Sequence, residues 1–173
     1  MCTKLALGDV VHCLAWLTAL RSLELDLSFC THLLDLDGLV GLGSVQVSVV
    51  GQAPVAGLAG LQVLTLNLSC CYQLANVDGL KGLAGLTGLQ ALSLDLSNCS
   101  QLATLEGVQS LPWVARLRKE LKDLKVTGAR VDSLAKASLG WSLKLTLSGC
   151  SKLANVEWLQ DFAHYPAFEI ILP

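Results

Sequence analysis

One pattern of hydrophobic and polar residues recurs along the chain, and it is clearest between Leu89 and Val108. Leu92, Leu94 and Leu96 alternate with polar residues, which is the period-two pattern of a strand with one buried and one solvated face. From Cys99 onward the hydrophobic residues fall three positions apart, which predicts a tight helical or 3₁₀-like return. A strand followed by such a return is one coil of a solenoid, so the pattern predicts a stack of similar coils.

Alignment on this pattern predicts seven strands. They are expected over residues 23–27, 45–49, 64–68, 92–96, 124–128, 143–147 and 168–172. Before the fifth strand, Pro112 and the helical spacing of Trp113, Leu117 and Leu121 predict a helix, with Ser110 as its expected cap. Asp132 predicts a further short helix, and residues 1–20 are interpreted as half a repeat rather than a signal peptide.

Four segments share the pattern LxLxxCxxLxxL or its Val-ended form: 25–36, 66–77, 94–105 and 145–156. They resemble the cysteine-containing subclass of the leucine-rich repeat family, and the resemblance covers nearly the whole chain. It implies an α/β fold, a leucine-rich repeat solenoid with a curved parallel sheet on its concave side and short helices or 3₁₀ turns on its convex side. About seven repeats would form a single domain over residues 1–173. Three repeats lack the cysteine, and serine replaces the family's asparagine at the strand end.

Polar and cysteine positions that recur with the repeat are assigned structural roles. Cys30, Cys71, Cys99 and Cys150 are expected to be small buried residues outside disulfides, which favours an intracellular, reducing compartment. A capping side chain followed two residues later by an acid is expected at each helix start, where the helix dipole favours an anion. These pairs are Asp35 with Asp37, Asn76 with Asp78, Thr104 with Glu106, and Asn155 with Glu157.

Composition argues against several classes of partner. The formal net charge is −2, whereas nucleic acids and anionic membranes select a basic face, so neither is expected as a partner. Residues 38–77 contain no Asp, Glu, Lys or Arg and would score as a hydrophobic span. They include Gln46, Pro54 and Asn67 and alternate with period two, which favours strands over a membrane-spanning helix.

No catalytic, cofactor-binding or metal-binding residues are predicted. His12, His32 and His164 occupy unrelated positions in the repeat, and the chain contains no CxxC pair. The glycine-rich segment 79–89 lacks the lysine followed by serine or threonine that ends a phosphate-binding loop. We therefore expect a protein that is not an enzyme and has no cofactor.

The outward positions of the strands are the candidate binding surface. The residues selected as a concave protein-binding face are Glu24, Asp26, Gln46, Thr65, Asn67, Ser93, Asp95, Lys125, Lys144 and Thr146. The alternative is that these side chains are polar only because the face is solvated. For Trp113, Trp141 and Trp158, packing in the core is favoured over a role as exposed anchors.

These observations favour a non-enzymatic protein-binding scaffold that serves as a structural or accessory subunit of a larger assembly. The alternative is a substrate-recognition or regulatory module such as the leucine-rich repeat adaptors of ubiquitin ligases. Because the terminal strand residues Ile170 and Leu172 are apolar, an end-to-end contact with a partner or a second copy is also expected.

Overall fold

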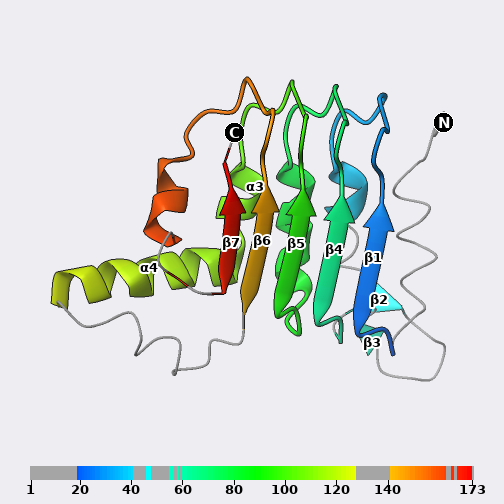
Figure 1. Ribbon diagram of the computed structural model, residues 1–173. Coiled ribbons are helices and arrows are strands. Elements are labelled where there is room, and N and C mark those ends of the chain that lie inside the picture. The colour runs from blue at the N-terminus through cyan, green and yellow to red at the C-terminus, as the bar shows by residue number, and fades with distance from the viewer. Residues whose placement is uncertain are drawn as a thin grey trace.

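A computed structural model describes residues 19–40, 46–47, 55–56, 58, 60–127, 141–162, 165 and 167–172 of the chain. Within these residues the fold is α/β, with a five-stranded, all-parallel open sheet and short helices over one of its faces (Figure 1). In spatial order the strands are β1 (Ser22–Asp26), β4 (Val63–Asn67), β5 (Ala91–Asp95), β6 (Ser142–Thr146) and β7 (Phe168–Ile171). The half repeat expected before residue 19 and the helix expected after Asp132 lie outside the described residues.

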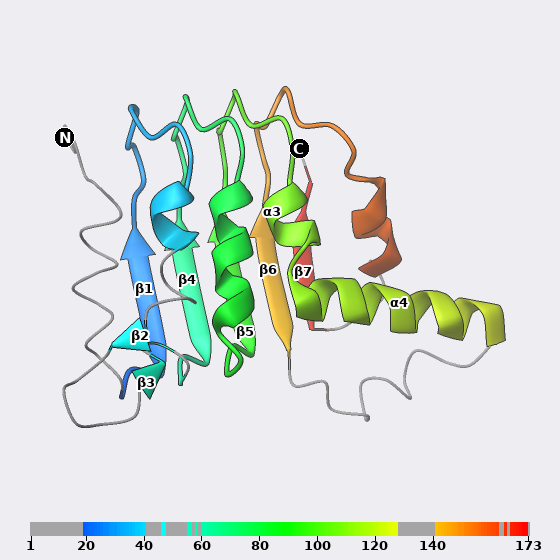
Figure 2. The same ribbon diagram turned by 180° about the vertical axis from the view of Figure 1, so that it is seen from behind.

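Each of the first four strands of this sheet is followed by a short helix on the same face (Figure 2). These are η1 (Asp37–Val40), η2 (Asp78–Gly85), α3 (Glu106–Gln109) and η3 (Glu157–Phe162), of which all but α3 are 3₁₀ helices. A longer helix, α4 (Pro112–Thr127), lies between α3 and β6 in the sequence. Helix η1 packs against η2, η2 against α3, and η3 against α4.

One of the seven predicted strands was wrong and another lies outside the parallel sheet, so the count of about seven repeats is not confirmed. Residues 124–128 were expected to form a strand, but α4 continues to Thr127 because the helical spacing of Leu117, Leu121 and Leu124 extends that far. At 45–49 the structure has the two-residue strand β2 (Gln46–Val47), which pairs antiparallel with β3 (Val55–Ala56). Strand β1 pairs directly with β4, which leaves β2 outside the parallel sheet.

The core is a stack of leucines contributed by alternate strand positions. Leu64 pairs in register with Leu92, and Leu92 with Leu143, and all three side chains are at most 1% exposed. Leucines of the returns, such as Leu74 and Leu102, are also fully buried. A single strand and its return, taken alone, would leave these leucines partly exposed. Their burial therefore requires neighbouring units on both sides.

The cysteines form a buried column behind the turn that ends each strand, as predicted. The Leu68 carbonyl accepts two hydrogen bonds, one from the Cys71 N–H (3.2 Å) and one from the Cys99 thiol (3.2 Å). Leu27 and Leu96 accept corresponding pairs, with the Cys71 and Cys150 thiols at 3.2 and 3.1 Å. A small side chain with a weak donor suits this site, because it fills the space and satisfies a buried carbonyl.

A left-handed residue precedes each of these cysteines. The φ angles are 57° at Phe29, 59° at Cys70, 60° at Asn98 and 77° at Gly149. Asparagine and glycine tolerate this conformation, whereas a bulky aromatic residue rarely adopts it. Phe29 is therefore the most strained member of the set.

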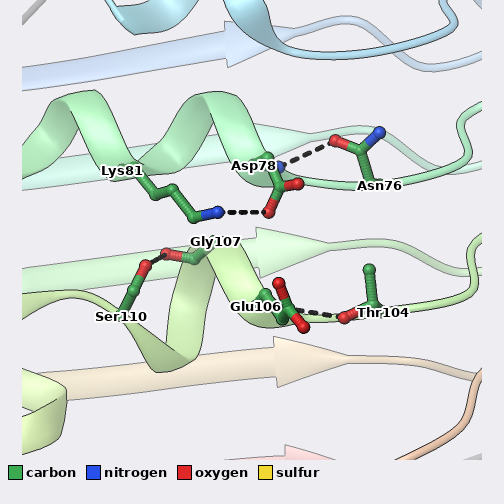
Figure 3. Close-up of polar contacts among 7 residues, drawn as sticks. All are labelled: Asn76, Asp78, Lys81, Thr104, Glu106, Gly107 and Ser110. Atoms are coloured by element: carbon green, nitrogen blue, oxygen red, sulfur yellow. Dashed lines mark hydrogen bonds and ion pairs between the residues drawn. The ribbon is translucent and has the colours of Figure 1, made fainter.

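Three of the four predicted capping residues accept the backbone N–H of the acid that begins a short helix, and two of these, Asn76 and Thr104, are drawn in Figure 3. Asn76 Oδ1 accepts the Asp78 N–H at 3.0 Å, and Thr104 Oγ1 accepts the Glu106 N–H at 3.2 Å. Asp35 acts in the same way on Asp37 at 3.1 Å. These hydrogen bonds satisfy backbone donors that a helix start leaves open, and the recurring acids lie in the first turns of the short helices, where the helix dipole favours an anion.

Ser110 does not have its predicted role at the start of α4. Its hydroxyl donates to the Gly107 carbonyl at 3.2 Å, at the end of α3 (Figure 3). The first backbone bond of α4 runs from the Ala115 N–H to the Leu111 carbonyl. Ser110 therefore closes α3, and Leu111 supplies the first acceptor of α4.

Glycines set the distance between adjacent helices of the layer. A Cβ added to Gly79 would lie 1.9 Å from the Leu36 carbonyl oxygen, and one added to Gly107 would lie 1.8 Å from that of Val77. Only glycine permits this approach. The corresponding position of η3 is Trp158, which is too large for such stacking, and η3 packs against α4 instead.

Candidate protein-binding face

We define the open face as the side of the sheet opposite the helices, which no described helix covers (Figures 1 and 2). The strand register places one residue from each strand in a row across this face. One row consists of Glu24, Thr65, Ser93, Lys144 and Glu169, and the next consists of Asp26, Asn67, Asp95, Thr146 and Ile171. The rows are polar except at Ile171. The position between them is hydrophobic on every strand and faces the opposite side of the sheet.

The two rows differ in how much of their hydrogen-bonding capacity the fold already uses. In the second row, Asp26, Asn67 and Asp95 each accept the backbone N–H of the serine two residues later, at 2.9 to 3.1 Å. Hydrogen bonds from the hydroxyl and then the backbone N–H of Ser28 hold the pKa of Asp26 below its usual value. This row therefore stabilises the turns at the strand ends as well as facing solvent.

A shallow hollow opens on the face near the first row. Its volume is about 340 Å³, and its lining includes Val63, Ala91, Ser93, Ser142, Lys144 and Glu169. The small side chains of Ala91, Ser93 and Ser142 create the depression, while Lys144 and Glu169 form an ion pair of 3.1 Å. The Lys144 and Glu169 side chains are 51% and 59% exposed, so this pair remains accessible to a partner.

The structure places all but two of the predicted binding residues on the open face. Gln46 lies in β2, outside the parallel sheet, and Lys125 lies in α4. Both were assigned to the face because strands were expected at their positions. Because Lys125 lies in α4, Lys144 is the one basic residue among the described members of the two rows, and it forms the ion pair with Glu169.

The tryptophans have divided roles, and sequence analysis missed the cavity that two of them line. Trp158 is buried and meets Phe162 edge to face at 5.9 Å, as expected for a core residue. Trp113 and Trp141 are half-buried, with ring centres 5.9 Å apart, and line a second hollow of about 250 Å³. The Trp113 indole N–H is buried and has no hydrogen-bond partner within the described part of the chain. The one signal in the sequence was the occurrence of Trp113, Trp141 and Trp158 in the C-terminal half of the chain.

The thiols of the cysteine column are poor nucleophiles. Burial raises the pKa of the Cys99 thiol to about 12, and it also raises the pKa values of Cys71 and Cys150. Nucleophilic or metal-binding cysteines need the thiolate, which burial disfavours here. Among the described residues, no group of three or more His, Cys, Asp or Glu side chains is arranged to hold a metal ion.

No family model, no curated protein and no solved structure matches this chain. In the described part of the chain, no helix combines the length and apolar character needed to cross a bilayer.

Proposed function

We propose that this protein is a leucine-rich repeat solenoid whose open face binds another protein, as a non-enzymatic scaffold or accessory subunit of a larger assembly. The observation that carries this proposal is the uncovered parallel sheet with rows of polar side chains and a hollow between small residues. Solenoids commonly bind partners through an extended face of this kind. The recurring order of strand, cysteine turn and short helix supports the assignment to the leucine-rich repeat class.

Three further observations support parts of this proposal. The described cysteines form no disulfide, which supports an intracellular, reducing compartment. The raised thiol pKa values and the position of the recurring acids in the first turns of the short helices, where the helix dipole favours an anion, support a role other than catalysis. The hollow lies beside an accessible ion pair, so it can accept a partner side chain and offer it polar contacts.

The test is capture of partners on immobilised protein, compared with a double variant of the open face. Thr65→Arg with Ser93→Arg places two large cations in the first row, where neither side chain has a role in the core. Gln73→Arg with Gln160→Arg adds the same charge at exposed residues of a turn and of η3.

We expect a partner that binds the wild type and the control pair but is lost from the open-face pair. Equal capture by all three proteins would reject the open face as the binding site. The identity of the captured partner then distinguishes a scaffold from a substrate-recognition module. A substrate-recognition module must capture a component of a modifying enzyme.

A further inference from the structure

The turn after β1 carries unusually exposed hydrophobic residues. The side chains of Phe29 and Leu34 are 66% and 59% exposed. The residues at the corresponding positions of the later units are smaller: Cys70, Asn98 and Gly149 for Phe29, and Ala75, Ala103 and Ala154 for Leu34. Phe29 also keeps a left-handed backbone that asparagine or glycine would adopt more readily, and strain of this kind persists where it serves a function.

Acidic residues surround these two side chains in the sequence. Residues 19–40 contain Glu24, Asp26, Asp35 and Asp37 and only one Lys or Arg, Arg21. The Arg21 guanidinium donates to the Gly60 carbonyl at 3.1 Å. We call Phe29, Leu34, Asp35 and Asp37 the acidic patch, because this stretch of nine residues carries two exposed apolar side chains and two carboxylates.

A surface of opposite character lies between the end of η2, the start of α4 and Trp141. The hollow of about 250 Å³ is lined by Leu86, Leu89, Pro112, Trp113, Arg116 and Trp141, among others, and we call it the aromatic hollow. Arg116 places its guanidinium carbon 6.0 Å from the centre of the Trp141 ring and forms an ion pair of 3.0 Å with Glu120, and its side chain remains 65% exposed. Lys119 and Lys122 are exposed further along α4, whose sequence carries five bases against two acids.

The size of the aromatic hollow restricts what can occupy it. Sites for cofactors and drug-sized molecules usually enclose about 300–1,000 Å³. This hollow is smaller and lies beside basic residues, which suits one or two apolar side chains from a segment that also carries negative charge. Phe29 and Leu34 beside Asp35 and Asp37 have this chemistry.

We propose that the aromatic hollow of one copy receives the acidic patch of a second copy, in a head-to-tail contact. The contact pairs two different surfaces, so it is heterologous, and each associated copy keeps one unused surface that can extend the assembly. Opposite charges on the two surfaces make it sensitive to salt. It uses neither row of the open face and does not depend on the proposed function.

The test measures self-association by sedimentation velocity up to about 1 mM protein, the weak end of measurable affinity. We expect concentration-dependent association of the wild type in 50 mM salt that weakens at 500 mM. Phe29→Asn removes the apolar side chain and installs the residue found at Asn98, and Ala84→Glu places an anion at an exposed position lining the hollow. Each variant should raise the apparent Kd at least tenfold.

Matched controls change the same residue types elsewhere. Ile171→Asn removes an exposed apolar side chain from β7, and Ala154→Glu adds an anion at an exposed alanine, and neither should alter the Kd. Circular dichroism establishes that each variant folds. Leu34→Asn replaces Phe29→Asn as the acidic-patch variant if the latter does not fold.

A mixture of the two inactive variants gives the decisive result. Phe29→Asn keeps the aromatic hollow, and Ala84→Glu keeps the acidic patch, so together they should form dimers and nothing larger. A wild type that stays monomeric to 1 mM, a mixture that stays monomeric, or association that survives both variants would overturn the proposal.

Discussion

Replacement of Gly107 by alanine tests whether close stacking of the short helices sets the geometry of the fold. The added Cβ would lie 1.8 Å from the Val77 carbonyl oxygen and 2.5 Å from its carbonyl carbon. A carbon and an oxygen in contact normally lie at least about 3.3 Å apart, so α3 would have to retreat by about 1.5 Å. The obstacle is backbone, which no rotamer change can remove.

The expected cost follows from two opposing terms. Forcing an extra carbon into a packed interior costs about 1–3 kcal/mol, and an immovable obstacle favours the upper limit. Alanine is a better helix former than glycine by about 1 kcal/mol. We therefore expect the free energy of unfolding to fall by about 2 kcal/mol, which lowers Tm by about 4–8 °C in a chain of this length.

Urea and thermal unfolding followed by circular dichroism measure this change. Glu106→Ala is the matched control, because it introduces the same residue one position earlier at an exposed site. It loses only an interaction with the helix dipole, worth about 0.3–1 kcal/mol. Midpoints of Gly107→Ala equal to those of the wild type would refute the close-stacking argument.

Three further predictions concern the buried column and the caps. At pH 8 an aromatic disulfide reagent should react with Cys71, Cys99 and Cys150 only after denaturant is added, because burial keeps these thiols protonated. Peptide mapping of the labelled sites measures this reactivity. Because the folded pKa values of these thiols are raised, the free energy of unfolding should be constant from pH 7 to about pH 9. Above that it should fall as the unfolded thiols ionise, by up to about 1.4 kcal/mol per thiol per pH unit. Urea titrations at pH 7 to 10 measure this change, and a rise would contradict it. Asn76→Ala removes the acceptor of the Asp78 N–H and should cost about 0.5–2 kcal/mol, whereas Gln73→Ala, at an exposed residue of the preceding turn, should cost less than about 0.5 kcal/mol in the same titration.

Local patterns were sufficient to predict most of the sheet and the helix starts. Alternating leucines located β4, β5 and β6 to within one residue, since a period of two with a buried face has few other solutions. The capping pairs were equally informative, because an Asn or Thr two residues before an acid acts within one turn of chain. Features of this kind depend on neighbours in the sequence.

The errors arose where distant contacts decide the structure. Residues 124–128 fit either a strand or the last turn of a helix, and residues 124–127 continue the helix that passes through Leu117. The alternation at 45–49 specified no pairing partner, and β2 pairs with β3 rather than with the sheet. The aromatic hollow requires η2, the start of α4 and Trp141 to converge, which no local pattern encodes.

Lysine footprinting with the captured partner tests the central claim, binding at the open face, most directly. Lys144 lies on that face beside the hollow, whereas Lys81 in η2 and Lys152 in the turn after Cys150 are exposed elsewhere on the molecule. We predict that the partner slows acetylation of Lys144 at least fivefold and leaves the rates at Lys81 and Lys152 unchanged. Slower acetylation of Lys81 or Lys152 with an unchanged rate at Lys144 would contradict binding at the open face.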